Sequence, residues 1–251
     1  MNPRSIVAYV LCALALAGAF TAVRMSLALD SDATTVSVAA PRNAVSALTD
    51  FAPGLEAPDA FTLVSSRSFL TGIEARSKNG NVNVVVEIPA GSVDKWEVDK
   101  SDGTLRWEMR DGEPRRVRYL GYPGNYGMIP RTLLPEEEGG DGDPLDVLIL
   151  GPSVPRGAVV EARVVGVLSL LDAGERDDKL LAVRPGTSMA EVIDLADLQE
   201  SFPGVTAIVE TWFAHYKGPG AIETRGFRGA DEARRVLDAA IRAFEARDAG
   251  S

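Results

Sequence analysis

The chain has almost none of the chemistry that histidine and cysteine provide. His215 is its one histidine, so a catalytic triad and a zinc site built from several histidines are both excluded. Its one cysteine, Cys12, lies in an apolar N-terminal segment, so the rest of the chain has no internal disulfide and no thiolate metal site. Any bound metal must therefore be held by carboxylates, which favours a hard ion such as magnesium, manganese or calcium.

The chain has fewer basic than acidic residues. The chain has 26 Lys and Arg against 36 Asp and Glu, which gives a formal net charge of −10. An acidic surface argues against a nucleic-acid partner, and none is expected. It does not exclude an anionic substrate, because metal ions or a few placed Lys and Arg can screen the charge. The 251 residues, 45% of them apolar, suit one packed domain with or without an appendage.

One apolar run, residues 6–23, stands at the N-terminus between Arg4 and Arg24. It predicts that residues 1–29 are a secretory signal peptide or a membrane anchor. The protein would then be exported, as a periplasmic protein or one tethered to a membrane through residues 6–23. The alternatives are a buried helix or a mis-called start, and a mis-called start would leave the protein in the cytoplasm.

Residues 30–60 are rich in Ala, Ser, Thr, Pro and Asp and show no sustained period, so they are predicted to be a flexible linker. The folded domain is predicted to span residues 61–251. Within it, β-branched or alternating runs predict strands at 82–88, 96–99, 105–109, 145–150 and 159–170. Asp102-Gly103 is a hairpin turn signal between two of them. Helices are expected at 189–200 and 230–246. This order predicts a small β-barrel with helices packed outside.

The strongest chemical signal is a loop with three carboxylates in six residues, Asp141, Asp143 and Asp146. These charges repel one another, so the loop must be solvated or neutralised by a cation. An EF-hand loop is a poor match, because it needs Gly at its sixth position, where Asp146 stands. Taken alone, such a cluster is more often a solvated turn than a metal site.

Further charged and aromatic residues accompany this loop. Lys95 and Glu97 flank Trp96, so both point to one face if that segment is extended. The other members of the set are Glu87, Tyr122, Tyr126, Asp172, Asp177, Lys179, Tyr216 and Lys217. Tyr122 and Tyr126 lie in Gly-Tyr-Pro-Gly-Asn-Tyr-Gly (121–127), which predicts a glycine-rich turn. Together they suit a site in which carboxylates hold several divalent ions while Lys, Arg and Tyr hold phosphate oxygens.

Five motifs, in this order, resemble those of the family I soluble inorganic pyrophosphatases. They are Val-Val-Glu-Ile-Pro-Ala (85–90), Lys-Trp-Glu-Val-Asp-Lys (95–100), Tyr-Pro-Gly-Asn-Tyr-Gly (122–127), Asp-Gly-Asp-Pro-Leu-Asp-Val-Leu (141–148) and His-Tyr-Lys (215–217). The resemblance covers about residues 61–246. It implies an α+β, mainly β fold: a five-stranded OB-like β-barrel with flanking hairpin strands and two outer helices. It also implies a Mg²⁺-dependent inorganic diphosphatase, with Mn²⁺ or other divalent ions as alternatives, that hydrolyses pyrophosphate to two phosphates.

The resemblance further implies roles for the matching residues. Asp143 would be the general base beside the attacking water. The metal ligands would be Glu87, Glu97, Asp141, Asp146, Asp172 and Asp177. The phosphoryl groups would be bound by Lys95, Arg115, Tyr122, Tyr126, Lys179, Tyr216 and Lys217.

Two positions depart from the family pattern. An acidic pair is usual where this chain has Asp172-Ala173, so one carboxylate is missing. The phosphate-binding arginine has four candidates, of which Arg115 is favoured by its place before Tyr-Leu-Gly-Tyr; the others are Arg110, Arg116 and Arg118.

Two expectations concern the whole protein. Bacterial relatives of this type often form hexamers, so a homo-oligomer is expected. The alternative to an enzyme is a non-catalytic exported protein that binds divalent metal or polyanions on the same scaffold.

Overall fold

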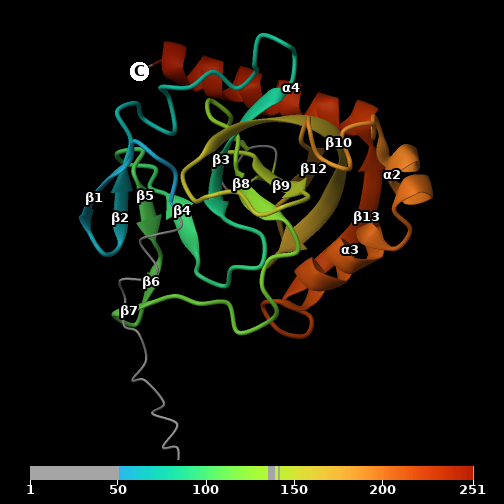
Figure 1. Ribbon diagram of the computed structural model, residues 1–251, viewed down its shortest axis with the longest axis horizontal. Helices are drawn as coiled ribbons and strands as arrows, with labels where there is room; N and C mark the ends of the chain where they lie inside the picture. The colour runs from blue at the N-terminus through green and yellow to red at the C-terminus, as the bar shows by residue number, and fades with distance from the viewer. Residues whose placement is uncertain (1–50, 135–138, 141, 251) are drawn as a thin grey trace, which may run out of the picture. The chain divides into compact units, whose positions relative to one another are not determined.

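Five strands close into a ring in the computed structural model, which describes residues 51–134, 139–140 and 142–250. The strands are β3 (Val82–Ile88), β8 (Asn125–Met128), β9 (Asp146–Leu150), β10 (Val159–Asp172) and β12 (Lys179–Val183). The hydrogen-bonded path runs β10-β12-β9-β8-β3 and then returns to β10 (Figure 1). Only the β9–β12 pair within this ring is parallel. The closed five-stranded sheet confirms the predicted mainly β barrel architecture.

Smaller sheets flank this ring. β1 (Glu56–Asp59), β2 (Thr62–Val64), β5 (Leu105–Trp107) and β4 (Trp96–Val98) form one sheet in that order. β6 (Met109–Arg110) pairs with β7 (Glu113–Pro114), while β11 (Glu175–Arg176) and β13 (Ile222–Gly229) pair with β10. The hairpin predicted at Asp102-Gly103 is confirmed, because β4 and β5 pair antiparallel and Gly103 has φ 72°.

Three helices, not two, are present in the described part of the chain: α2 (Leu195–Ser201), α3 (Val205–His215) and α4 (Ala230–Ala249). The helix predicted at 189–200 is wrong in its first half. Asp194 has an extended backbone and its side chain accepts from the N–H groups of Ala196 and Asp197, so the helix begins after it. It ends at Phe202, since the next residue is Pro203.

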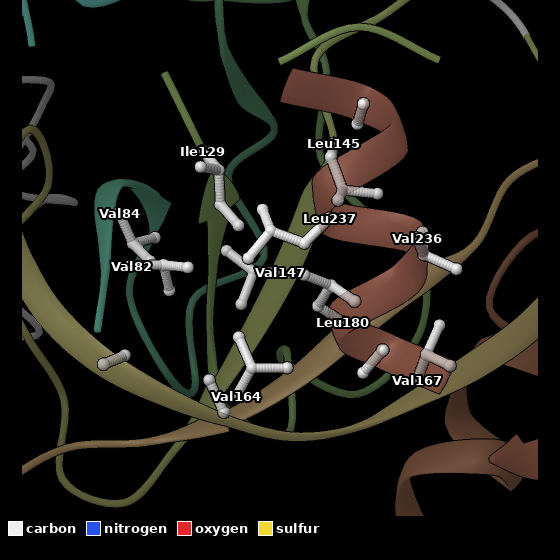
Figure 2. Packing of buried hydrophobic residues seen from close by; sticks show 14 of the residues in the cluster. Val82, Val84, Ile129, Leu145, Val147, Val164, Val167, Leu180, Val236 and Leu237 are labelled. Carbon is white, nitrogen blue, oxygen red and sulfur yellow. The ribbon is translucent and has the colours of Figure 1, made fainter. Parts of the chain in front are cut away.

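The helix predicted at 230–246 is confirmed as α4, which packs its apolar stripe on the closed sheet. Ala233, Val236, Leu237 and Ala240 recur at helical spacing and are all buried. They form one hydrophobic cluster with alternate residues of the strands, including Val82, Val147 and Leu180 (Figure 2). The opposite side chains of β9 and β12 join a second cluster with α3, so each face of these strands has its own core.

The linker prediction is wrong for its last ten residues. Ala52 N–H donates to the Arg156 carbonyl (2.8 Å), and β1 lies within the range 51–60. Phe51 and Leu55 pack against the core of the small sheet, which explains why this segment is ordered. Residues 1–29 and 30–50 lie outside the described residues. No helix in the described ranges is long and apolar enough to span a membrane.

The glycine-rich segment around Tyr126 is a strand, whereas the sequence predicts a turn. A Cβ on Gly127 would lie 1.9 Å from the Val85 carbonyl oxygen, so only glycine allows β8 to approach β3 this closely. The buried side chain of Asn125 holds the same strand in place. It accepts from the N–H groups of Ala90 and Val154 and donates to the Pro152 carbonyl. Tyr126 therefore projects from a fixed backbone.

Candidate active site

Most of the predicted site residues line one cavity of about 400 Å³, here called the central cavity. Of the predicted set, the structure brings together Lys95, Glu97, Arg115, Tyr126, Asp143, Asp146, Asp172, Asp177, Lys179, Tyr216 and Lys217. A second cavity of about 710 Å³ shares six lining residues with it and adds Glu87. This second space is called the adjoining cavity. Residues more than 120 positions apart in the chain therefore meet at one place.

Strand pairing places the central cation and its acidic partners. Lys179 on β12 pairs with Asp146 on β9, and Asp177 lies two residues earlier on the same side as Lys179. The Lys179 ammonium is 2.5 Å from Asp146 Oδ2 and also contacts Asp177. Burial opposes the charge on Lys179, but the two carboxylates outweigh it and raise the pKa of Lys179. A cation is therefore stabilised between these two carboxylates.

Glu87 and Lys95 form the deep wall between β3 and β4. Glu87 is buried, and its Oε1 accepts from the N–H of Val98 at 2.8 Å. Burial raises the pKa of Glu87 to about 8, an effect only partly opposed by Lys95. Burial would lower the pKa of Lys95, but Glu87 and Glu97 outweigh it, so that pKa is raised. Lys95 Nζ lies 3.4 Å from Glu97 Oε2.

Three tyrosines stack behind the charged groups. Tyr126 faces the cavity beneath Lys95 and Lys179, whose ammonium groups lie 5.7 and 5.8 Å from its ring centre. Tyr122 lines neither the central nor the adjoining cavity. It packs behind Tyr126, with ring centres 5.1 Å apart, and its predicted contact with substrate stays a prediction. Burial raises the pKa of Tyr126 and of Tyr216, so both phenols stay protonated and can donate.

The acidic loop is described only in part, because Asp141 lies outside the described residues. Asp143 lines both cavities, and its carboxylate contacts the Lys100 ammonium. At the opposite side, Asp172 contacts Lys217. Asp143 and Asp172 thus each contact a lysine ammonium, to which an anionic ligand could also bind.

Of the four candidate arginines, only Arg115 lines the central cavity. Its Nη1 lies 2.7 and 2.5 Å from the two carboxylate oxygens of Glu108. The other three, Arg110, Arg116 and Arg118, line a separate cavity nearby. The structure therefore places Arg115, of the four candidates, beside the other predicted site residues, and its binding of phosphate stays a prediction.

Among the lining residues that were not predicted are Glu108, which lines both cavities, and Lys100, which lines the adjoining cavity. The register of the β4–β5 hairpin contains a signal for Glu108. Trp96 pairs with Trp107, and one step further the Glu108 N–H donates to the Lys95 carbonyl (2.8 Å), so Glu108 lies opposite Lys95. Lys100 ends the second motif, but its contact with Asp143 depends on folding across 43 residues.

The donor set fits a hard divalent cation. Asp146, Asp172, Asp177 and Glu97 line one cavity, and no histidine or thiol competes with their oxygens. Among the described residues, which leave out Asp141, no three such groups converge tightly enough to form a complete metal cluster. Lys179 instead neutralises Asp146 and Asp177.

Comparison with known proteins identifies the family. The sequence profile described as Inorganic pyrophosphatase matches residues 84–245. The chain belongs to the inorganic pyrophosphatase family. It is 36% identical over 172 residues to the inorganic pyrophosphatase of Agrobacterium fabrum, covering 66% of this chain and 90% of that one. It is also 36% identical to soluble inorganic pyrophosphatase 2 of Chlamydomonas reinhardtii, covering 65% and 81%.

Solved structures of this pyrophosphatase family share the fold. The type I inorganic pyrophosphatase of Toxoplasma gondii superposes with a TM-score of 0.69 at 28% identity, covering 73% of this chain and 92% of that one. As a family member this chain is an inorganic diphosphatase, a hydrolase that depends on a divalent metal. The alternative of a non-catalytic metal-binding or polyanion-binding protein finds no support among these relatives.

Proposed function

We propose that this pyrophosphatase cleaves inorganic pyrophosphate in the central cavity with several Mg²⁺ ions and a water that Asp143 deprotonates. The observation that carries the proposal is the mixture of charges in one cavity. Seven carboxylates and four Lys or Arg side chains line it. Carboxylates alone would repel pyrophosphate, and basic groups alone would hold no metal, so the mixture suits a metal–polyanion complex.

The carboxylates divide into two groups by place. Asp146, Asp172 and Asp177 would hold metal at the centre, while Glu87 and Glu97 would hold it at the β3–β4 wall. Asp141, which lies outside the described residues, is proposed as a ligand from its motif alone. When bound, Mg²⁺ lowers the pKa of water towards neutrality and neutralises phosphate oxygens. Mn²⁺ has the same preference for oxygen ligands, so it is the natural substitute.

The basic and phenolic groups would hold the two phosphoryl groups. Lys179 contacts Asp146 and Asp177 and would bind a phosphate oxygen, while these two carboxylates would hold metal. Arg115 donates to the Glu108 carboxylate, which fixes the orientation of its guanidinium. The other N–H groups of Arg115 would then donate to a phosphate oxygen. Lys95, Tyr126, Tyr216 and Lys217 complete the donor set around the same cavity. Tyr122 supports Tyr126 from behind.

Asp143 is the group best placed to act on water. It lies at the boundary shared by the central and adjoining cavities, and it precedes the β9 strand that carries Asp146. The Asp143 carboxylate would accept a proton as the water oxygen bonds to phosphorus. Lys100, whose ammonium contacts the Asp143 carboxylate, would be a positioning residue.

A turnover assay tests the proposal. Phosphate release from pyrophosphate should require Mg²⁺, stop with excess EDTA and return when Mg²⁺ is added back. Full activity in EDTA, or none in Mg²⁺, would contradict it. A matched control is the Arg242→Ala variant, because Arg242 is exposed on α4 and lines a different cavity.

Location and assembly are separate proposals. The apolar run at 6–23 supports export or membrane anchoring through residues 1–29. N-terminal sequencing of the purified protein together with cell fractionation tests the export proposal, and an intact N-terminus in the cytosolic fraction would contradict it.

A homo-oligomer is also proposed. Light scattering at several protein concentrations measures the molar mass in solution, and the mass of a monomer would contradict this proposal.

A further inference from the structure

The tip of the β10–β11 hairpin carries a carboxylate of the central cavity to which the proposed function gives no role. Glu175 lines this cavity and is exposed to solvent. The other six carboxylates of the cavity each contact a Lys or Arg side chain: Glu97, Glu108, Asp143, Asp146, Asp172 and Asp177. Glu175 forms no ion pair and no side-chain hydrogen bond with any described residue. Its charge is therefore the one among these seven that no described side chain balances.

The register of the hairpin places Glu175 directly opposite Asp172. Residues opposed in this way lie on one face of the sheet, with Cβ atoms about 4.5–5.5 Å apart. The Asp177 N–H donates to the Leu170 carbonyl (3.1 Å), so the same pairing continues and Asp177 lies on that face as well. Like charges directly opposite each other are destabilising, so this face of the hairpin favours a cation that binds both Asp172 and Glu175.

The basic residues nearby do not neutralise this pair of carboxylates. Lys217 contacts Asp172, which leaves one of the two negative charges unbalanced. Arg176 follows Glu175 in the chain but lies on the other face of the hairpin, where its Nε donates to the buried Asp178 (2.7 Å). The Arg176 N–H also donates to the Gly139 carbonyl (2.7 Å), which fixes the hairpin beside the start of the acidic loop.

Two opposed carboxylates suit Mg²⁺ better than a larger ion. Mg²⁺ keeps several of its waters and is usually held by one or two carboxylates together with phosphate oxygens of a substrate, whereas Ca²⁺ takes six to eight oxygen ligands. Within the described part of the chain no three acidic groups converge into a complete cage. Lys217, which contacts Asp172, is proposed above to hold a phosphoryl group, so substrate oxygens would be available to an ion at this pair.

We infer that Glu175 is a further metal ligand of this enzyme and that it shares one Mg²⁺ ion with Asp172. The inference rests on the proposed function, which assigns Asp172 to metal. The ion would neutralise the two opposed carboxylates. A phosphate oxygen bound to it would then be protected from their repulsion.

Titration of the full chain with Mn²⁺, followed by EPR with and without inorganic phosphate, tests the inference. Glu175→Gln has the same size and no charge. It should weaken the binding of one Mn²⁺ ion by about tenfold or more, because even residues that only support a metal ligand change affinity by about 10- to 100-fold. Asp172→Asn should weaken the same ion, so the double variant should lose one ion and not two. The Mg²⁺ concentration that gives half-maximal hydrolysis of pyrophosphate should rise in Glu175→Gln by a similar factor.

Glu191→Gln is the matched control, because it removes the same charge from an exposed residue that lines neither cavity of the site. It should bind Mn²⁺ as the wild type does. The effect of Glu175→Gln should also persist in about 1 M KCl, where the Debye length of about 3 Å screens a charge that acts only from a distance. Equal melting temperatures of the metal-free proteins would show that the variants fold.

Three results overturn the inference. They are a Glu175→Gln variant that binds Mn²⁺ with the stoichiometry and affinity of the wild type, a difference that disappears in KCl, and a double variant that loses two ions. A wild-type chain that binds Mn²⁺ through Glu175 but releases no phosphate from pyrophosphate contradicts the proposed function instead.

Discussion

Asp143 and Asp146 lie three residues apart but have different surroundings. Asp143 precedes Pro144 in the loop and contacts Lys100, whereas Asp146 begins β9 and contacts the buried Lys179. One therefore lies at the solvent side of the cavity and the other at its centre. Their positions support different roles, a proton acceptor and a metal ligand.

The first prediction separates these roles. Asp143→Asn should keep Mg²⁺ affinity and lose turnover by about 10²- to 10⁴-fold, the usual contribution of a general base. Asp146→Asn should lose both, because it removes a ligand. Isothermal titration with Mg²⁺ and phosphate release measure the two quantities. If Asp143→Asn turns over like wild type, the assignment of the base is wrong.

The second prediction concerns the buried carboxyl of Glu87. Its folded pKa, about 8, lies above the ordinary value of 4.5, so between these pH values the folded state binds more protons than the unfolded state. The metal-free protein should therefore lose stability as pH rises from 4.5 to 8, by an amount on the order of a few kcal/mol. Glu87→Gln keeps the oxygen that accepts from Val98 and removes the titration.

Urea unfolding of the metal-free proteins at pH 5 and pH 8 measures this difference. Glu87→Gln should match wild type near pH 5 and be the more stable protein at pH 8. The exposed Glu175→Gln is the control and should show no such crossover. A constant difference between Glu87→Gln and wild type at both pH values would show that Glu87 does not titrate in this range.

At the scale of elements, the β10–β11 hairpin carries the departure from the family pattern. Asp172 pairs with Glu175, so Ala173 and Gly174 form a two-residue turn, with φ 52° and 94°. Both values are positive, as a type I′ turn requires. Alanine is disfavoured there, whereas Asn and Asp tolerate this conformation. The missing carboxylate thus coincides with a strained position.

The third prediction follows from that turn. Ala173→Asn should stabilise the protein by about 0.5–1 kcal/mol, because it relieves the left-handed alanine without adding charge. Ala173→Val should destabilise it, since a β-branched residue fits φ > 0 worse still. Equilibrium unfolding in urea checks both variants. An Asn variant less stable than wild type would contradict the argument.

Elements with a strong local pattern were predicted well. The strand at 82–88 matches β3 residue for residue, and the helix at 230–246 lies within α4. The sequence predicts no strand at β12, because its five buried residues show no alternation of polar and apolar side chains. It predicts a turn rather than a strand at Tyr126, because the contact that requires Gly127 comes from β3, about 40 residues earlier.

At the scale of the whole molecule, the start of the folded domain affects the site. β1 is the first strand of the sheet β1-β2-β5-β4, and the last strand of that sheet carries Glu97. Phe51 and Ala52 attach this region to Arg156, whose guanidinium donates to the Glu87 carbonyl at 3.0 Å. Residues 51–60 thus connect to the wall that holds Glu87 and Glu97.

The fourth prediction compares two truncations. A chain that begins at Phe51 should keep the melting temperature and pyrophosphate hydrolysis of the full chain. A chain that begins at Phe61 should melt at a lower temperature and hydrolyse more slowly, because it lacks β1 and the contacts of Phe51 and Ala52. Differential scanning calorimetry and phosphate release test both. Equal behaviour of the two chains would mean that residues 51–60 carry no stability.

The sequence by itself determined the family, the reaction class and the need for oxygen ligands. These depend on residue types and on motif order, which are local properties: the single histidine, the acidic run at 141–146 and the two tyrosines of the motif at 122–127 are visible without a fold. Only the tertiary structure decided which arginine reaches the cavity, that Tyr122 lies behind Tyr126, and that Lys100 contacts Asp143. Those outcomes depend on contacts between segments far apart in the chain: Arg115 lines the cavity with Lys217, Tyr122 packs on Trp212 of α3, and Lys100 meets a residue 43 positions later.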